Sequence, residues 1–93
     1  MKIYQVGETV TCKVTVLRSG ALYNPITSVL IYIYIEGTST LLVNGVAMYN
    51  ESTGIFTYDF QTPSCIADKY CWYCKVTDGV KIGIKYDTFK LEA

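Results

Sequence analysis

Two cysteines lie far apart in the chain, and each falls in the apolar phase of a strand-like run. Apolar and polar residues alternate around Cys12, and apolar residues recur at every second position around Cys74. A period of two is typical of a β-strand with one face buried. The apolar phases consist of Val10, Cys12, Val14 and Val16 in the first run and Tyr70, Trp72, Cys74 and Val76 in the second. We therefore expect both thiols to point into one core from two strands.

β-branched and aromatic residues recur in short runs along the whole chain, with turn residues between the runs. Short strands at such spacing are typical of an all-β sandwich or barrel. No segment has apolar residues at helical spacing between capping residues, so we expect no helix. A chain of 93 residues has the size of one small domain, residues 1–93. The predicted strands are 2–4, 9–17, 28–36, 40–43, 46–49, 54–61, 70–77 and 81–91, with irregular stretches at 18–27 and 62–69.

Two dipeptides have the composition of tight hairpin turns. Asn44-Gly45 and Asp78-Gly79 each lie between alternating apolar segments. Asn, Asp and Gly tolerate the positive φ that both central residues of a type I′ turn require. We therefore predict a hairpin at each dipeptide.

The last predicted strand changes phase near its middle. Its two apolar sets are Ile82, Ile84 and Tyr86 in one phase, and Phe89 and Leu91 in the other. An uninterrupted strand would leave one set facing away from the core. We therefore predict a β-bulge near residue 87 or 88 that turns both sets toward the core.

Four cysteines in a small domain suggest disulfide stabilisation, because a short chain buries little surface. Four cysteines allow three pairings. Strand parity favours Cys12 with Cys74 across the core, which leaves Cys65 to close a short ring with Cys71. Chain entropy predicts roughly 4 kcal/mol of stabilisation from the long ring and about 2 kcal/mol from the short one.

The segment Cys71-Trp72-Tyr73-Cys74 also has the spacing of thiol redox centres and zinc sites. A redox dithiol usually lies at the start of a helix within a βαβ unit, and no helix is predicted here. Residues three apart in a strand point to opposite faces, which separates the two sulfurs. A zinc site would have to use all four cysteines without a second C-x-x-C segment or a histidine. Structural disulfides are the preferred interpretation, with a metal site and a redox site as alternatives.

The composition excludes several classes of function. Without histidine, Ser-His-Asp and Cys-His catalysis and imidazole metal sites are excluded. The carboxylates show no calcium-loop spacing, and no Gly-rich phosphate loop is present. Eight Lys and Arg residues balance eight Asp and Glu residues and are scattered, so we expect no nucleic-acid partner. No apolar run approaches the roughly 20 residues that span a bilayer. We expect a soluble protein that is not an enzyme, with no cofactor and no membrane insertion.

The start of the chain is unusual for a protein with disulfides. Met1 leads directly into a predicted strand without an apolar stretch of secretory length, so we expect no signal peptide in this chain. Disulfides persist outside the reducing cytosol or in hyperthermophiles. Three interpretations stay open: a mature domain that received Met1 by cloning, an internal protein of a thermophile, and a virion protein assembled without secretion.

Short segments along nearly the whole chain carry a family resemblance. They are Tyr4-x-Val6-Gly7-Glu8-Thr9-Val10, Pro25-x-x-Ser28-Val29, Gly45-x-Ala47-Met48, Ser52-Thr53-Gly54-Ile55-Phe56-Thr57-Tyr58, Pro63 and Asp87-Thr88-Phe89. These segments resemble the small immunoglobulin-like (Ig-like) domains of bacterial, archaeal and phage proteins, and they are similar to macroglobulin-type domains. The resemblance implies an Ig-like antiparallel β-sandwich of seven to eight strands. Antibody domains differ, because they carry a tryptophan on the third strand, where this chain has Ile31 and Ile33.

An Ig-like strand order would place the third, sixth and seventh strands in one sheet. The outer face of that sheet would carry Tyr32, Tyr34, Tyr73, Lys75 and Lys85. Tyrosine combines a large contact area with a low entropy cost and is enriched in interfaces. We expect this face to bind a protein partner or a second copy. The same tyrosines could instead be cross-strand pairs that stabilise an exposed sheet, and this alternative stays open.

Members of the resembled family are typically spacers, adhesion modules or virion-surface domains, which implies a non-catalytic structural or protein-binding module. Disulfides without a signal peptide favour a virion component from a hot environment, such as a capsid decoration or tail protein on a virion or extracellular surface. One alternative is an adhesion or spacer domain of a larger microbial cell-surface protein. A second alternative is a small thiol redox protein that uses Cys71 and Cys74.

Overall fold

The computed structural model describes residues 1–63 and 65–93, and all regular elements in them are β-strands. The all-β prediction is therefore confirmed. Residue 64, within the irregular stretch predicted at 62–69, lies outside the described residues. The strands are β1 (Lys2–Gln5), β2 (Thr9–Thr15), β3 (Leu17–Arg18), β4 (Ala21–Leu22), β5 (Ser28–Ile35), β6 (Leu41–Ala47), β7 (Tyr49–Ser52), β8 (Ile55–Gln61), β9 (Asp68–Asp78) and β10 (Lys81–Glu92).

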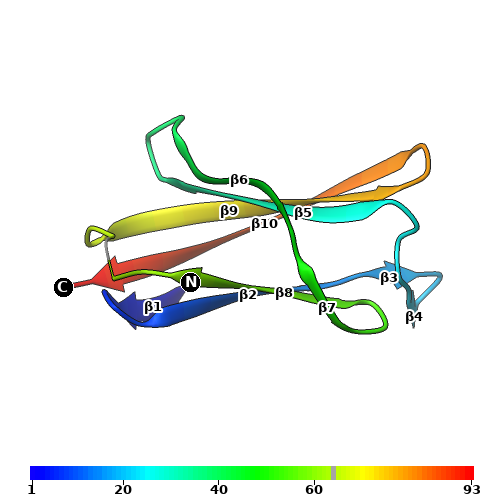
Figure 1. Cartoon of the computed structure of the whole chain (residues 1–93), viewed down its shortest axis with the longest axis horizontal. Coiled ribbons are helices and arrows are strands. Elements are labelled where there is room, and N and C mark those ends of the chain that lie inside the picture. Colours follow the sequence, from blue (N-terminus) through cyan, green and yellow to red (C-terminus); the bar gives the residue numbers. More distant parts are fainter. Residues whose placement is uncertain (64) are drawn as a thin grey trace.

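The strands form two larger sheets and one short ribbon. Sheet A has five strands in the order β1-β10-β9-β5-β6, sheet B has three in the order β2-β8-β7, and β3 pairs with β4. Figure 1 shows β9, β5 and β6 in one layer, β2, β8 and β7 in the other, and the chain crossing between layers from β6 to β7. At this crossing Met48 is buried, and its N–H donates to the carbonyl oxygen of Val29 at 2.9 Å.

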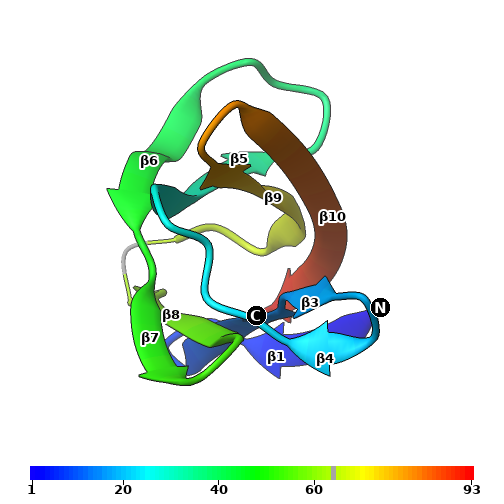
Figure 2. The same cartoon turned by 90° about the vertical axis from the view of Figure 1, so that its right-hand side faces the viewer.

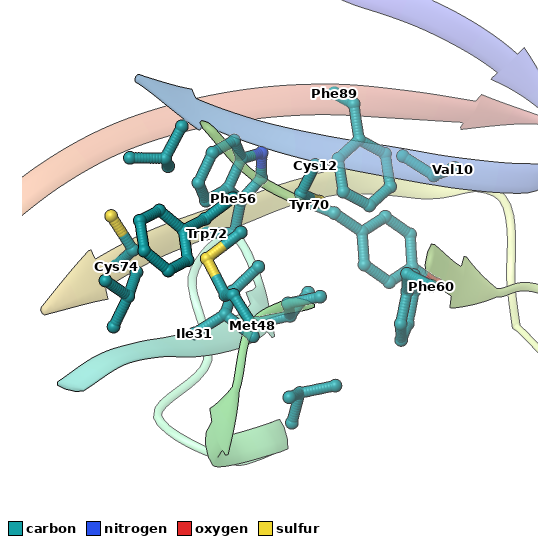
Figure 3. Packing of buried hydrophobic residues seen from close by; sticks show 14 of the residues in the cluster. Val10, Cys12, Ile31, Met48, Phe56, Phe60, Tyr70, Trp72, Cys74 and Phe89 are labelled. Carbon is teal, nitrogen blue, oxygen red and sulfur yellow. The ribbon is translucent and has the colours of Figure 1, made fainter. Parts of the chain in front are cut away.

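The core lies between the two sheets and takes one face of each. Exposed and buried residues alternate along β2, as its sequence pattern predicts. The rings of Tyr70 and Phe89 stack in the core with their centroids 5.3 Å apart. Figure 3 shows both rings among the buried side chains of the core. The largest fully buried side chains are Tyr70, Phe89, Ile31, Ile33, Leu91, Val10, Thr62, Cys12 and Cys74.

Strand β1 pairs with β10 in parallel, so sheet A is mixed and not purely antiparallel as predicted. After β1 the chain leaves sheet A and enters sheet B as β2, so these two sequence neighbours lie in different sheets. A buried threonine holds this crossing. The Thr62 hydroxyl accepts from the Gly7 N–H at 2.8 Å and donates to the Glu8 carbonyl oxygen at 2.6 Å.

Strand β10 pairs with β9 in one uninterrupted register from Lys81 to Leu91, so the predicted β-bulge is wrong. Phe89 and Leu91 face the core and are buried. The other apolar set stays on the outer face of sheet A, where Ile82, Ile84 and Tyr86 are 59%, 48% and 72% exposed. Because the pairing with β9 has no register shift, side chains alternate between the two faces along the whole of β10. The first apolar set therefore points outward, and the second apolar set points into the core.

The dipeptide Asn44-Gly45 does not form a hairpin turn, because it lies inside the single strand β6. The pairing of β5 with β6 shifts between Ile31 and Tyr32, whose partners are Val46 and Asn44, so Gly45 is the extra residue of a β-bulge. Its φ of 67° is the positive value that the sequence predicted for a turn. The predicted strand 40–43 and the first half of the predicted strand 46–49 are thus one strand, whereas Tyr49 begins β7 in sheet B.

The second predicted hairpin is confirmed, with a change in turn type. β9 and β10 are joined by Gly79 and Val80, of which Gly79 alone has a positive φ, 64°. That pattern fits a type II′ turn and not type I′. The sequence analysis missed a smaller hairpin, β3 to β4, in which Ser19 and Gly20 have φ values of 52° and 79°. A positive φ at both central residues is the signature of type I′.

The predicted disulfide between Cys12 and Cys74 is wrong, and both are free thiols. The parity argument placed both side chains correctly, since each is fully buried between the sheets. Parity predicts the face to which a side chain points, but it does not predict whether two cysteines lie at the same level of the core. Figure 3 shows Trp72 and Phe56 between the two cysteines in that view. Burial, followed by the nearby carboxylates of Asp87 and Asp59, raises the pKa of Cys12 to about 12.

The predicted disulfide between Cys65 and Cys71 is also wrong, and these thiols are free as well. Cys65 packs against the core side of the molecule, beside the Tyr70 hydroxyl. Cys71 follows Tyr70 in β9 and lies opposite Tyr34 of β5 and Thr88 of β10 on the outer face. Neighbouring residues of a strand point to opposite faces, so sheet A separates the two sulfurs.

We predict that all four cysteines of the protein unfolded in denaturant react with iodoacetamide without added reductant. In the folded protein at neutral pH, Cys12 and Cys74 should react far more slowly than Cys71, because both are buried and burial raises the pKa of both thiols. Intact mass and peptide mapping measure both results. Fewer than four modifications in denaturant, restored by reductant, would contradict the free-thiol state.

Candidate binding surface

A ladder of tyrosine rings crosses three neighbouring strands on the outer face of sheet A. Tyr73 of β9 lies opposite Tyr32 of β5 on one side and opposite Tyr86 of β10 on the other. The Tyr32 and Tyr73 rings stack with centroids 4.7 Å apart, and the Tyr73 and Tyr86 centroids are 5.6 Å apart. Tyr34 meets the Tyr73 ring at 6.4 Å in an edge-on arrangement. We call these four tyrosines and Ile84 the tyrosine face.

Gly45 makes room for one end of the ladder. A side chain added at Gly45 would lie 3.2 to 3.4 Å from atoms of the Tyr32 ring and hydroxyl. The ring of Tyr32 is therefore held between the bulge of β6 and the Tyr73 ring. Both neighbours restrict its rotation, so this part of the face is preorganised for contact.

The tyrosine face encloses an open hollow of about 540 Å³, lined by Tyr34, Thr38, Ser39, Leu41, Tyr73, Ile84 and Tyr86. Three of the lining side chains are tyrosines, each of which pairs an apolar ring with a hydroxyl that can donate or accept. Partial desolvation, followed by the neighbouring Cys71 thiol, raises the pKa of Tyr34 above its usual value. A tyrosine hydroxyl is protonated at neutral pH, and the direction of this shift leaves Tyr34 able to donate a hydrogen bond.

The structure brings four of the five predicted binding residues onto one face. Tyr32, Tyr34 and Tyr73 are in contact, and Lys75 lies on the same face, opposite Leu30 of β5. The placement of Lys85 is a correction. It pairs with the buried Cys74 and so points to the opposite side of β10 from Tyr86. The predicted bulge would have turned Lys85 to the outer face, but the register of β10 with β9 contains no bulge.

Tyr86 and Ile84 belong to the tyrosine face and Ile82 lies on the same side of β10, although the sequence predicted all three in the core. A signal was present in the sequence. Phe89 and Leu91 alone supply the core contacts of β10, and Lys81, Gly83 and Lys85 share their phase. A straight strand with charged residues in the core phase indicates that the core ends before that segment.

The outer face of sheet B is chemically different. Thr11 donates to the Asp59 carboxylate at 2.7 Å, and Thr9 donates to the side-chain oxygen of Gln61 at 3.0 Å. These pairs join β2 to β8 with small polar side chains that water also solvates well. This polar face provides a matched control surface for the tyrosine face.

A second hollow, of about 300 Å³, lies where β3 meets the β9-β10 hairpin. At its rim the Asp78 carboxylate accepts from the Tyr23 hydroxyl at 3.2 Å and from the Ile26 N–H at 2.9 Å. The Arg18 guanidinium lies over the Tyr23 ring, 5.1 Å from its centroid. These polar groups are occupied with one another, and they fasten the loop before β5 to the hairpin.

The described residues, 1–63 and 65–93, contain no group of three or more His, Cys, Asp or Glu side chains that could hold a metal ion. Cys71 and Cys74, the residues of the redox alternative, have their side chains on opposite faces of sheet A. Within the same part of the chain, no buried side-chain nitrogen or oxygen lacks a hydrogen-bond partner. No helix in it is long and apolar enough to cross a membrane.

Comparison with protein families, with curated proteins and with solved structures gave no match to this chain.

We predict a favourable coupling of about 0.5–1.5 kcal/mol between the stacked rings of Tyr32 and Tyr73, measured as a double-mutant cycle on the free energy of unfolding. The cycle uses Tyr32→Ala, Tyr73→Ala and the double variant in urea denaturation. Tyr49, which is 70% exposed on β7 in sheet B, combined with Tyr73 gives the control cycle, for which we expect no coupling. Equal coupling in the two cycles would contradict the stacked geometry.

Proposed function

We propose that this protein is a non-catalytic binding module that uses the tyrosine face of sheet A to hold a protein partner. The observation that carries the proposal is the continuous ladder from Tyr32 through Tyr73 to Tyr86, which leaves the outermost ring 72% exposed. Cross-strand stabilisation accounts for Tyr32 and Tyr73, which are partly buried. It does not account for Tyr86 and Ile84 remaining open to solvent on the same face.

The chemistry of this face favours a protein over other partners. Its central outward positions on β9 are Cys71, Tyr73 and Lys75, so the charge there is low and the aromatic area is large. Interface cores are enriched in tyrosine and depleted in charged residues. A nucleic-acid surface would instead need clustered Lys and Arg residues.

We further propose that the fold is Ig-like. The sheet orders β1-β10-β9-β5-β6 and β2-β8-β7 support this, because they correspond to the order A′GFCC′ and BED when the strands are named along the chain. The parallel pairing of β1 with β10 and the crossing from β6 to β7 fit the same order. The core of this domain uses Trp72 and stacked aromatic rings instead of an inter-sheet disulfide.

The free thiols bear on where such a module would be used. The preference for a virion component from a hot environment depended on disulfides, so that argument no longer favours it over an adhesion or spacer domain. Both settings use a non-catalytic module that presents a binding face.

The test uses a photoreactive phenylalanine analogue at Tyr34 and, as the matched control, at Thr57 on the outer face of sheet B. In cells that express the gene, we expect a single defined protein adduct from position 34 and none from position 57. In the purified pair, replacing Tyr32, Tyr34 and Tyr73 with Thr should weaken binding about hundredfold while leaving the circular dichroism spectrum unchanged. Binding that survives this triple replacement would overturn the proposal.

A further inference from the structure

The first half of β10 is an open sheet edge. Every residue from Lys81 to Asp87 is exposed, whereas β1 covers only the other half, from Phe89 to Glu92. In the end-on view of Figure 2, β10 curves along one side of the molecule from the β9 hairpin down to β1. An edge strand with free N–H and C=O groups is a template for pairing with another strand.

The hydrogen bond between β1 and β10 shows which backbone groups point to this edge. The Val6 N–H donates to the carbonyl oxygen of Glu92 at 2.9 Å, so the Glu92 carbonyl points away from β9. The backbone N–H and C=O groups of successive residues in a strand point alternately to its two sides. The register of β10 with β9 has no shift, so this alternation continues along the whole strand. Ile82, Ile84 and Tyr86 therefore turn their N–H and C=O groups toward the open edge.

We propose that two copies of this chain pair antiparallel through this edge, with Ile84 of each copy on the two-fold axis. Sheet A would then continue from one copy into the other. In this register Ile82 lies opposite the second copy's Tyr86, and Lys81 lies opposite the second copy's Asp87. Each of these contacts occurs twice, because a two-fold interface is made of the same patch on both subunits.

Charge selects this register over its neighbours. Outer-face residues of one copy pair with outer-face residues of the other only when the two-fold axis passes through a residue and not between two residues. The neighbouring registers therefore place the axis one residue earlier or later in β10. With the axis at Lys85, the two copies' Lys85 side chains would lie directly opposite each other. With the axis at Gly83, Lys81 would lie opposite the second copy's Lys85. Both contacts bring like charges together, which destabilises cross-strand pairs.

The residues between the charged pairs also fit. Lys85 lies opposite the second copy's Gly83, and a side chain added at Gly83 would meet nothing within 4 Å. The long Lys85 side chain therefore has space across the interface. On the other face, Ile82, Ile84 and Tyr86 form apolar cross-strand pairs from residues that are otherwise exposed. This self-complementarity identifies the occupant of the edge as a second copy.

The interface uses Ile84 and Tyr86, the edge residues of the tyrosine face, and leaves Tyr32, Tyr34 and Tyr73 free. The dimer would then present two copies of these three tyrosines on one continuous sheet. Two linked faces bind a repetitive partner more tightly than one, because the second contact is intramolecular.

Sedimentation equilibrium over a concentration series tests the dimer. Lys81→Asp and Asp87→Lys, made singly, should each raise the dissociation constant on the order of tenfold, because two attractive pairs become repulsive. The double variant restores both pairs with reversed polarity and should return the dissociation constant close to that of the wild type. Glu51→Lys, an exposed charge change on β7 at the edge of sheet B away from β2, is the matched control and should have no effect.

A second variant tests the backbone pairing without changing charge. Ile84→Pro removes an N–H that faces the open edge and keeps the hydrogen bonds to β9, so it should abolish the dimer while thermal unfolding remains cooperative. The triple Tyr→Thr variant of the previous section should still dimerise. A wild type that is monomeric at all concentrations, or single charge variants that the double variant does not rescue, would overturn the proposal.

Discussion

The unbroken pairing of β10 with β9 is the constraint on which the functional surfaces depend. From Lys81 to Leu91 each residue of β10 has one partner on β9, and this fixes the face of every side chain. It sends Phe89 and Leu91 into the core, and it aligns Tyr86 with Tyr73 and Tyr32 in one ladder. The same pairing extends β10 past the end of β1, which leaves one edge of sheet A uncovered.

The two sheets differ in width, and this difference determines where the core is packed. Sheet A is wide and its β9-β10 hairpin is long, whereas sheet B has three strands and covers less of it. Core packing therefore depends on large side chains near the middle, where Trp72, Tyr70 and Phe89 meet residues of β2 and β8. Ile82, Ile84 and Tyr86 lie on the outer face of sheet A, which sheet B does not cover, and their apolar surface is available for partners.

Local patterns in the sequence predicted the longer strands and most of their faces, because a period of two needs only neighbouring residues. They did not predict the short strands β3, β4 and β7. The pairing and the stagger of strands that are distant in sequence were not predictable from such local patterns. Cys12 and Cys74 have the correct parity, but their positions along the core depend on the stagger between sheets, which no local pattern encodes. Gly45 has the expected positive φ, but whether it serves a turn or a bulge depends on the pairing of β5 with the whole of β6. The tyrosine face was found because its residues share one phase, and Tyr86 was missed because apolar residues were assumed to be buried.

The most direct test of the account is the β9-β10 register, measured by nuclear Overhauser contacts between α protons. In antiparallel sheets these contacts are strongest in the pairs that do not exchange hydrogen bonds. We expect them between Tyr86 and Tyr73 and also between Thr88 and Cys71, on both sides of Asp87. A contact of Lys85 with Tyr73 alongside that of Thr88 with Cys71 would require an extra residue in β10. That result would return Ile84 to the core face and contradict both the tyrosine ladder and the edge pairing.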